Sequence, residues 1–186
     1  MATTPKTMTL AEFLELPEGK PALEYEDGRI TRKPVSPKGK HGTIQAEFPE
    51  RVNAFSRPRR LARAFTETRF NYHDRYRVPD VVVYRHERVP RDPDGKVADD
   101  FFIPPDVAVE VLSPRQTIER LIERCEWYVA NDVPIALLAN PRDESVRKYL
   151  PGQPAQLLRG SERIDLDAVL PGFQLTVQEL FEALVV

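Results

Sequence analysis

Two carboxylates stand in stretches of sequence that otherwise have the composition of buried strands. Asp80 opens the apolar run 79–84, and Glu110 interrupts the apolar run 105–112. An unpaired carboxylate is unfavourable to bury, so each acid requires a compensating positive charge. That charge is either a metal ion or an arginine.

A divalent metal ion would give this pair of acids a chemical role. Magnesium binds hard oxygen ligands and keeps waters that a substrate can replace, so a phosphodiester would complete its coordination. The ion can polarise the phosphoryl oxygen and lower the pKa of a bound water. The alternative is structural: Glu110 pairs with a core arginine, and Asp80 accepts backbone hydrogen bonds at the start of its strand.

The segment before the first acid contains a turn and a helix. Asp27-Gly28 suits a tight turn because glycine accepts a positive φ, which predicts a hairpin over 23–33. Apolar residues then recur at helical spacing over 40–55, where Pro49 is expected to kink or break the helix.

The later elements are predicted in the same way. The alternating stretch 61–72 resembles one strand. Ser113-Pro114 has the residue types of a helix start, with the serine as cap, and the helix is expected to reach Asn131. The apolar run 134–139 predicts another buried strand.

Strands therefore both alternate with helices and follow one another directly. A hairpin is predicted over 145–158, and short capped helices are predicted after Thr9 and over 176–184. This order favours a mixed α/β fold of the α+β type, with a central mixed sheet flanked by helices and an N-terminal helix and hairpin.

The composition is that of an ordinary soluble globular protein. The 186 residues are 41% apolar and 30% charged, which fits one domain over 1–186. No apolar run approaches the roughly 18 residues of a membrane span, and the first residues do not form a signal peptide, so we expect a cytoplasmic protein. The single cysteine, Cys125, lacks metal-ligand spacing and is expected in the core.

Positive charge is concentrated in one part of the chain. Residues 28–77 contain thirteen Arg and Lys against four Asp and Glu, a net charge of +9 in a chain whose overall charge is −2. Such a block can attract nucleic acid, although a charged run is also an ordinary solvated face.

Several short motifs occur in a distinctive order. They are MTLAEF at 8–13, LEYEDG at 23–28, Ser36-Pro37 followed by His41, PDVVV at 79–83, PDVAVEVLSP at 105–114 and LPGF at 170–173. In this order they resemble the Uma-two family of bacterial proteins described as endonucleases, over nearly the whole chain. The resemblance implies the PD-(D/E)XK restriction-endonuclease-like fold.

The resemblance also implies roles for individual residues. Asp80 and Glu110 would be the metal ligands, with Mg²⁺ or Mn²⁺ as the cofactor, and Glu24 would be a supporting ligand or a water-orienting acid. Without the family, Glu24 would be interpreted as an exposed hairpin carboxylate. His41 matches a family histidine and, with Lys40, is expected to contact substrate phosphate; a buried structural histidine is the alternative.

The sequence departs from the family pattern on the basic side of the site. The superfamily lysine is expected two residues beyond the second acid, where this chain has Leu112. On the following helix Arg124, four residues before Tyr128, corresponds to a family lysine. Arginine stays protonated, so it would stabilise phosphoryl charge and would not act as a base. Asn140 stands where family members commonly show an aspartate.

Three functions are compatible with these residues. The leading hypothesis is a metal-dependent endonuclease acting on DNA, with RNA left open as a substrate and a homodimer as a plausible assembly for cutting two strands. The second is a catalytically silent nucleic-acid-binding or assembly module. The third is a hydrolase of a small phosphorylated ligand, because the sequence encodes no base readout.

Overall fold

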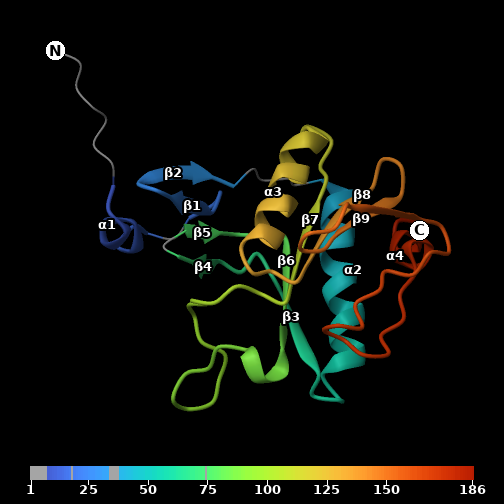
Figure 1. Cartoon of the computed structure of the whole chain (residues 1–186), viewed down its shortest axis with the longest axis horizontal. Coiled ribbons are helices and arrows are strands. Elements are labelled where there is room, and N and C mark those ends of the chain that lie inside the picture. Colours follow the sequence, from blue (N-terminus) through green and yellow to red (C-terminus); the bar gives the residue numbers. More distant parts are fainter. Residues whose placement is uncertain (1–7, 18, 34–37, 74) are drawn as a thin grey trace.

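A six-stranded sheet forms the centre of the computed structural model, which describes residues 8–17, 19–33, 38–73 and 75–186 (Figure 1). The strand order is β10-β9-β8-β7-β6-β3. The strands are β3 (Ala62–Thr66), β6 (Val81–Arg85), β7 (Val107–Val111), β8 (Ile135–Asn140), β9 (Ser145–Tyr149) and β10 (Gln156–Arg159). The β7 and β8 strands pair in parallel and the other neighbours are antiparallel, so the sheet is mixed.

Helices cover the two faces of this sheet (Figure 1). On one face α2 (Gly39–Ser56) packs Ile44, Phe48 and Val52 against the strands, together with α4 (Val177–Glu182). On the other face lies α3 (Ile118–Ala130), which connects β7 to β8 as a parallel pair requires. Its buried Cys125 belongs to the core of that face, as predicted.

A second, four-stranded sheet lies beside the first in the order β2-β1-β5-β4 (Figure 1). Its strands are β1 (Leu23–Glu26), β2 (Arg29–Arg32), β4 (Phe70–Tyr72) and β5 (Arg75–Arg77). The short α1 (Leu10–Leu14) covers one face, where Phe13, Tyr25 and Tyr76 form a small core. A 3₁₀ turn, η1 (His86–Arg88), follows β6.

Several local predictions are confirmed. The β1–β2 hairpin turns at Asp27 and Gly28, whose φ angles of 48° and 81° are positive as a two-residue hairpin turn needs. Thr9 and Thr176 cap α1 and α4 in capping boxes. The mixed sheet flanked by helices confirms the predicted fold class. The Ser36-Pro37 motif lies outside the described residues.

Three predicted boundaries are wrong. The stretch 61–72 is two strands in different sheets, because Glu67 adopts a positive φ of 48° and ends β3. The helix predicted from Ser113-Pro114 begins later, at Ile118. Residues 113–116 form a turn instead, in which the Gln116 N–H donates a hydrogen bond to the Ser113 carbonyl. Proline is favoured at the second position of such a turn as well as at a helix start.

A kink or a break is predicted at Pro49, and the break does not occur. The α2 helix runs through Pro49 for 18 residues. A proline inside a helix costs about 3 kcal/mol, which the burial of Ile44, Phe48 and Val52 against the sheet can offset. Among the described residues, no helix has the length and apolar content that crossing a bilayer requires.

Candidate active site

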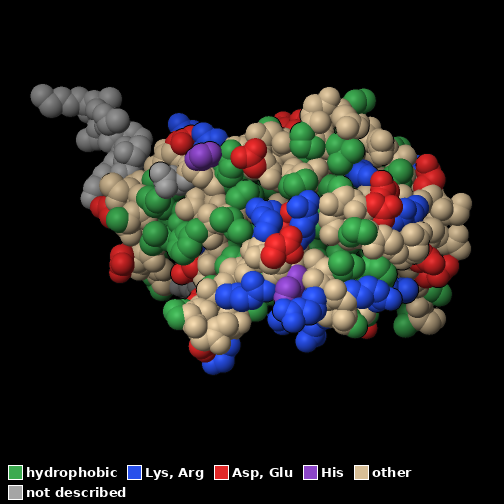
Figure 2. All heavy atoms as spheres, turned by 60° about the horizontal axis from the view of Figure 1, so that its bottom comes forward, with side chains coloured by type: hydrophobic (Ala, Val, Ile, Leu, Met, Phe, Trp, Pro, Cys, Tyr) green, Lys and Arg blue, Asp and Glu red, His purple; other side chains and the backbone are tan. Residues whose placement is uncertain are grey.

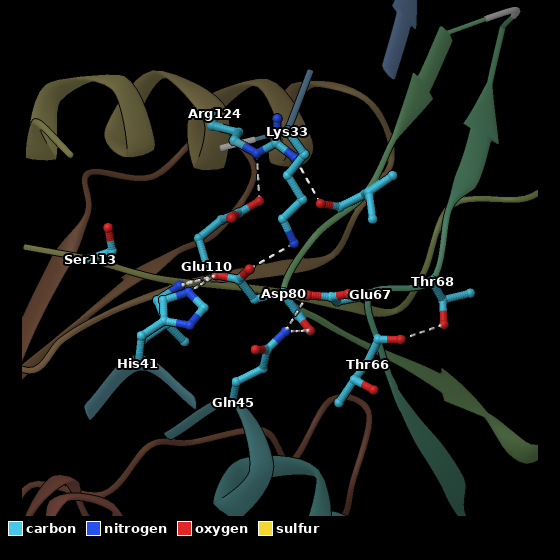
Figure 3. A network of polar contacts seen from close by, with 12 residues as sticks. Lys33, His41, Gln45, Thr66, Glu67, Thr68, Asp80, Glu110, Ser113 and Arg124 are labelled. Atoms are coloured by element: carbon cyan, nitrogen blue, oxygen red, sulfur yellow. Dashed lines mark hydrogen bonds and ion pairs between the residues drawn. The ribbon is translucent and has the colours of Figure 1, made fainter. Parts of the chain in front are cut away.

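Asp80 lies immediately before β6 and is buried, at 4% exposure. Its Oδ2 accepts a hydrogen bond from the Val111 backbone N–H (2.8 Å) and lies 3.2 Å from His41 Nε2. Its Oδ1 lies 2.7 Å from Lys33 Nζ. Figure 3 shows Lys33 and His41 reaching Asp80 from different elements. The first acid is therefore held by a backbone donor of β7, a helix residue and a lysine.

These partners control the charge of Asp80. Burial alone would raise the pKa of the carboxyl, but the hydrogen bond to His41 and the positive charge of Lys33 outweigh it and lower the pKa to about 2. Asp80 is thus an anion at neutral pH despite its burial.

Glu110, in the middle of β7, faces α3 and meets Arg124. Glu110 Oε1 accepts hydrogen bonds from Arg124 Nε (2.5 Å) and the Tyr128 hydroxyl (2.6 Å). Burial raises the pKa of Glu110 above its ordinary value; Arg124 opposes this shift and Asp80 adds to it. The second acid is therefore paired with an arginine. This is the structural alternative that the sequence left open beside a metal ion.

Arg124 also binds Glu24, which comes from the small sheet. Its two terminal nitrogens donate to the two carboxylate oxygens of Glu24 at 2.8 and 2.5 Å, and one of them also donates to the Val78 carbonyl. The Val78 N–H in turn donates to Glu24. Although burial opposes it, Arg124 lowers the pKa of Glu24. Glu24 is 4% exposed, so it is not a free hairpin carboxylate.

Lys33 is the site residue that the sequence interpretation missed. It directly follows β2, is 8% exposed, and ion-pairs with Asp80. The missing signal was strand alternation. Thr31 pairs with Glu24, and Lys33, two residues further along, therefore lies on the same face of the hairpin as Glu24. A lysine therefore lies beside the acids at the end of β2, whereas Leu112 is packed in the core under α3.

Replacing Lys33 by glutamine is expected to reduce stability by about 1–2 kcal/mol at pH 7, because the Asp80 carboxylate would lose the charge that helps to lower its pKa. A depressed carboxyl pKa contributes stability above the unfolded value, here 3.8, and that contribution disappears as the pH falls towards about 2. The stability difference between wild type and Lys33→Gln should therefore be constant above about pH 5 and vanish near pH 2. Urea unfolding across this range measures it.

A matched control is Lys148→Gln. Lys148 is also buried, but its partner Asp165 is half exposed, at 54%, and lies 3.3 Å away. Its stability difference should depend less on pH because solvent screens the pair. Identical pH profiles for the two variants would contradict the role given to Lys33.

Two cavities meet at the Lys33–Asp80 pair. The larger, of about 400 Å³, is lined by α1 and β1 residues, by the β3–β4 connection, and by Lys33, His41 and Asp80. The smaller is lined by Lys33, Asp80, Glu110, Arg124 and the α3 start, including Arg120. Figure 2 shows acidic, basic and histidine side chains gathered in the middle of one face.

The remaining candidate residues divide into those near the pair and those apart from it. His41 contacts Asp80 and lines the larger cavity. Lys40 is exposed to solvent and is not among the described residues that line either cavity. Asn140 ends β8, where its side-chain oxygen accepts a hydrogen bond from the Arg142 N–H; it is a turn residue there.

The two acids could hold a hard divalent cation only in a small donor set. Among the described residues no three His, Cys, Asp or Glu side chains are grouped as metal ligands. Magnesium, however, commonly uses one or two carboxylates and completes its shell with water and substrate. Every hydrogen bond to Glu110 from the described residues ends on Oε1, which leaves Oε2 for an ion. Asp80 Oδ1 is paired with Lys33 at 2.7 Å, so an ion bound there would take the place of the ammonium.

Comparison with known proteins identifies the family of this chain. The family model Uma2, described as a putative restriction endonuclease, matches residues 10–178. The chain belongs to the Uma2 family. This confirms the resemblance inferred from the motifs and makes the protein nuclease-like. No curated protein gives a significant match.

A solved structure extends the Uma2 comparison to the fold. It is the crystal structure of a putative nuclease belonging to DUF820 from Anabaena variabilis, with 34% sequence identity and a TM-score of 0.88. The match covers 96% of this chain and 99% of that one. The Uma2 fold described above, with both sheets, is therefore shared nearly end to end.

Proposed function

We propose that this protein is a metal-dependent endonuclease that hydrolyses DNA phosphodiester bonds. The observation that carries the proposal is a cluster of charged side chains from separate elements. Lys33, Asp80, Glu110 and Arg124 line the smaller cavity, and Arg124 joins Glu24 to them. Perturbed acids in a recess are typical of catalytic sites. The Uma2 family and its nuclease neighbour support the reaction class.

Asp80 and Glu110 would hold Mg²⁺ or Mn²⁺. Bound there, the cation would polarise the phosphoryl group and assist ionisation of the attacking water. Lys33 would then exchange its ion pair with Asp80 for a substrate phosphate oxygen, which places one positive charge beside the reacting group.

Arg124 has a different task. Four of its five N–H groups would be engaged by the hydrogen bonds to Glu24, Glu110 and Val78, which leaves one for other partners. We therefore assign it chiefly to positioning the two glutamates, and give the contact with phosphate to Lys33. His41 would hold Asp80 in place from α2.

The basic segment 28–77 supports DNA as the substrate. Part of it forms α2 and the strands that adjoin the site, and Figure 2 shows Lys and Arg side chains around the central acids. Such charge attracts the phosphate backbone without reading bases.

The full chain should cleave plasmid DNA when MgCl₂ or MnCl₂ is present and stop when a chelator is added, because the two acids alone supply no nucleophile. Agarose gels follow the conversion of supercoiled to nicked and linear DNA. Cleavage that continues unchanged in chelator would refute metal dependence.

One observation favours a second function. Asp80 and Glu110 are already neutralised by Lys33 and Arg124, so the cluster is electrostatically satisfied by the protein itself. A catalytically silent nucleic-acid-binding module would have such a cluster. It predicts salt-sensitive DNA binding without cleavage at any metal concentration in the same assay.

A further inference from the structure

We propose that the larger cavity binds one unpaired nucleotide of the substrate strand, with its base in the cavity and its phosphate at the Lys33–Asp80 pair. This would make the protein selective for single-stranded or locally unpaired nucleic acid. The inference rests on the proposed function for the position of the phosphate.

The first support is the arrangement of the two cavities. Of the residues that line them, Lys33 and Asp80 are common to both. The smaller cavity, of about 20 Å³, has room for an ion or a water and not for a nucleotide. A nucleotide in the larger cavity would bring its phosphate to Lys33 Nζ, a buried ammonium that lies 2.7 Å from Asp80 Oδ1.

The second support is the chemistry of the walls. Phe13, Leu23 and Val78 line the larger cavity, which suits the faces of a nucleobase. Arg69 also lines it and places its guanidinium 5.5 Å from the Phe13 ring centroid. Phe13 is 1% exposed and packs on Tyr25 and Tyr76, so the flat group open to a ligand is the Arg69 guanidinium, whose side chain is 27% exposed. Guanidinium planes are usual platforms for unpaired bases.

The third support is the negative charge of other wall residues. Asp99 and Asp100 line the cavity and are exposed. Glu67 lines it too, but beside the Lys33–Asp80 pair, because its backbone N–H donates to the Asp80 carbonyl. The Asp99 and Asp100 carboxylates repel a phosphate but can accept hydrogen bonds from the amino groups of a base. A nucleotide is therefore oriented with its phosphate towards Lys33 and its base away from it.

Size adds a constraint. A volume of about 400 Å³ lies in the range of small-molecule sites, which take a single small ligand. A base in a duplex can enter only after leaving its stack, which costs a few kcal/mol. An unpaired base enters without that cost.

The test measures binding in chelator, so that cleavage does not interfere. Fluorescence anisotropy would compare a labelled single strand of eight nucleotides, a blunt duplex of the same sequence, and single strands that each lack one base. We expect the single strand to bind at least about tenfold more tightly than the duplex, and one abasic position to lower its affinity by about 5- to 100-fold.

Thr68→Trp fills the cavity from the β3–β4 connection and should abolish both differences. Gln156→Trp, on the exposed edge strand β10, adds the same ring elsewhere and should preserve them. The abasic series requires no variant, so it remains decisive if Thr68→Trp does not fold.

Equal affinity for single strand and duplex, or tolerance of every abasic position, would overturn the inference. Binding of free nucleoside monophosphate without binding of the strand would also overturn it, since the ligand would then be a small phosphorylated molecule. Absence of cleavage in magnesium together with the expected binding pattern would refute the proposed hydrolysis alone.

Discussion

Asp80→Ala and Glu110→Ala are each expected to reduce metal-dependent DNA cleavage by about 10³-fold or more, because a catalytic metal contributes several kcal/mol to stabilising the transition state. Both carboxylates line the smaller cavity. The bonds to Glu110 from Arg124 and Tyr128 end on Oε1, and an ion at Asp80 Oδ1 would replace the Lys33 ammonium. Initial rates of plasmid nicking at saturating MgCl₂ measure the effect.

The matched control for these variants is Asp106→Ala. Asp106 is also a buried acid that pairs with an arginine: its Oδ1 lies 2.6 Å from Arg88 Nη1. It lies just before the first residue of β7, whereas Glu110 lies near the last, and it is not among the residues that line the two cavities. If it folds, it should retain near wild-type cleavage. Equal activity in wild type and in both site variants would refute the proposed catalytic role.

Replacing Arg124 by leucine is expected to destabilise the protein by about 3–5 kcal/mol, because it leaves two buried carboxylates without their charge partner. Glu24 and Glu110 are 4% and 2% exposed, so water cannot substitute for the guanidinium. The loss should begin to shrink above pH 4.5 and continue to fall below it, because burial raises the pKa of a carboxylate that has lost Arg124 and protonation removes its charge. Urea or thermal unfolding measures it.

Two comparisons make the Arg124 result specific. Arg51→Leu breaks a surface pair with Glu47, with Arg51 48% exposed, and should cost under about 1 kcal/mol. Adding Glu24→Gln and Glu110→Gln to Arg124→Leu should recover part of the lost stability, since the buried negative charges are then gone. Equal losses for Arg124→Leu and Arg51→Leu would contradict the buried network.

The sequence predicted the acidic half of the site and only part of its basic half. Asp80 and Glu110 were recognisable because a carboxylate in an apolar strand demands compensation. The compensating groups were harder to identify: Arg124 has no acidic residue three or four positions away on its own helix, and its partners in the structure come from β1 and β7. Long-range pairing of this kind has no local signature.

Lys33 illustrates the same limit. Strand alternation in residues 23–33 places Lys33 on the same face as Glu24, but its burial depends on how the small sheet packs against the large one. The boundaries that were wrong also depended on context. Turns at Glu67 and Ser113 interrupted a predicted strand and delayed a predicted helix. At Pro49, packing of the helix against the sheet outweighed the tendency of proline to break it. The cytoplasmic location, the cofactor and the homodimer stay predictions.

The turn at Asp27-Gly28 has a consequence beyond the hairpin that it closes. It fixes which residues of β1 and β2 face each other, and Glu24 and Lys33 reach the site only in that pairing. A shift of one residue would turn one of the strands over and carry its charge away from the cluster. Gly28, which contributes no side chain, therefore belongs among the positions least tolerant of change during the evolution of this protein.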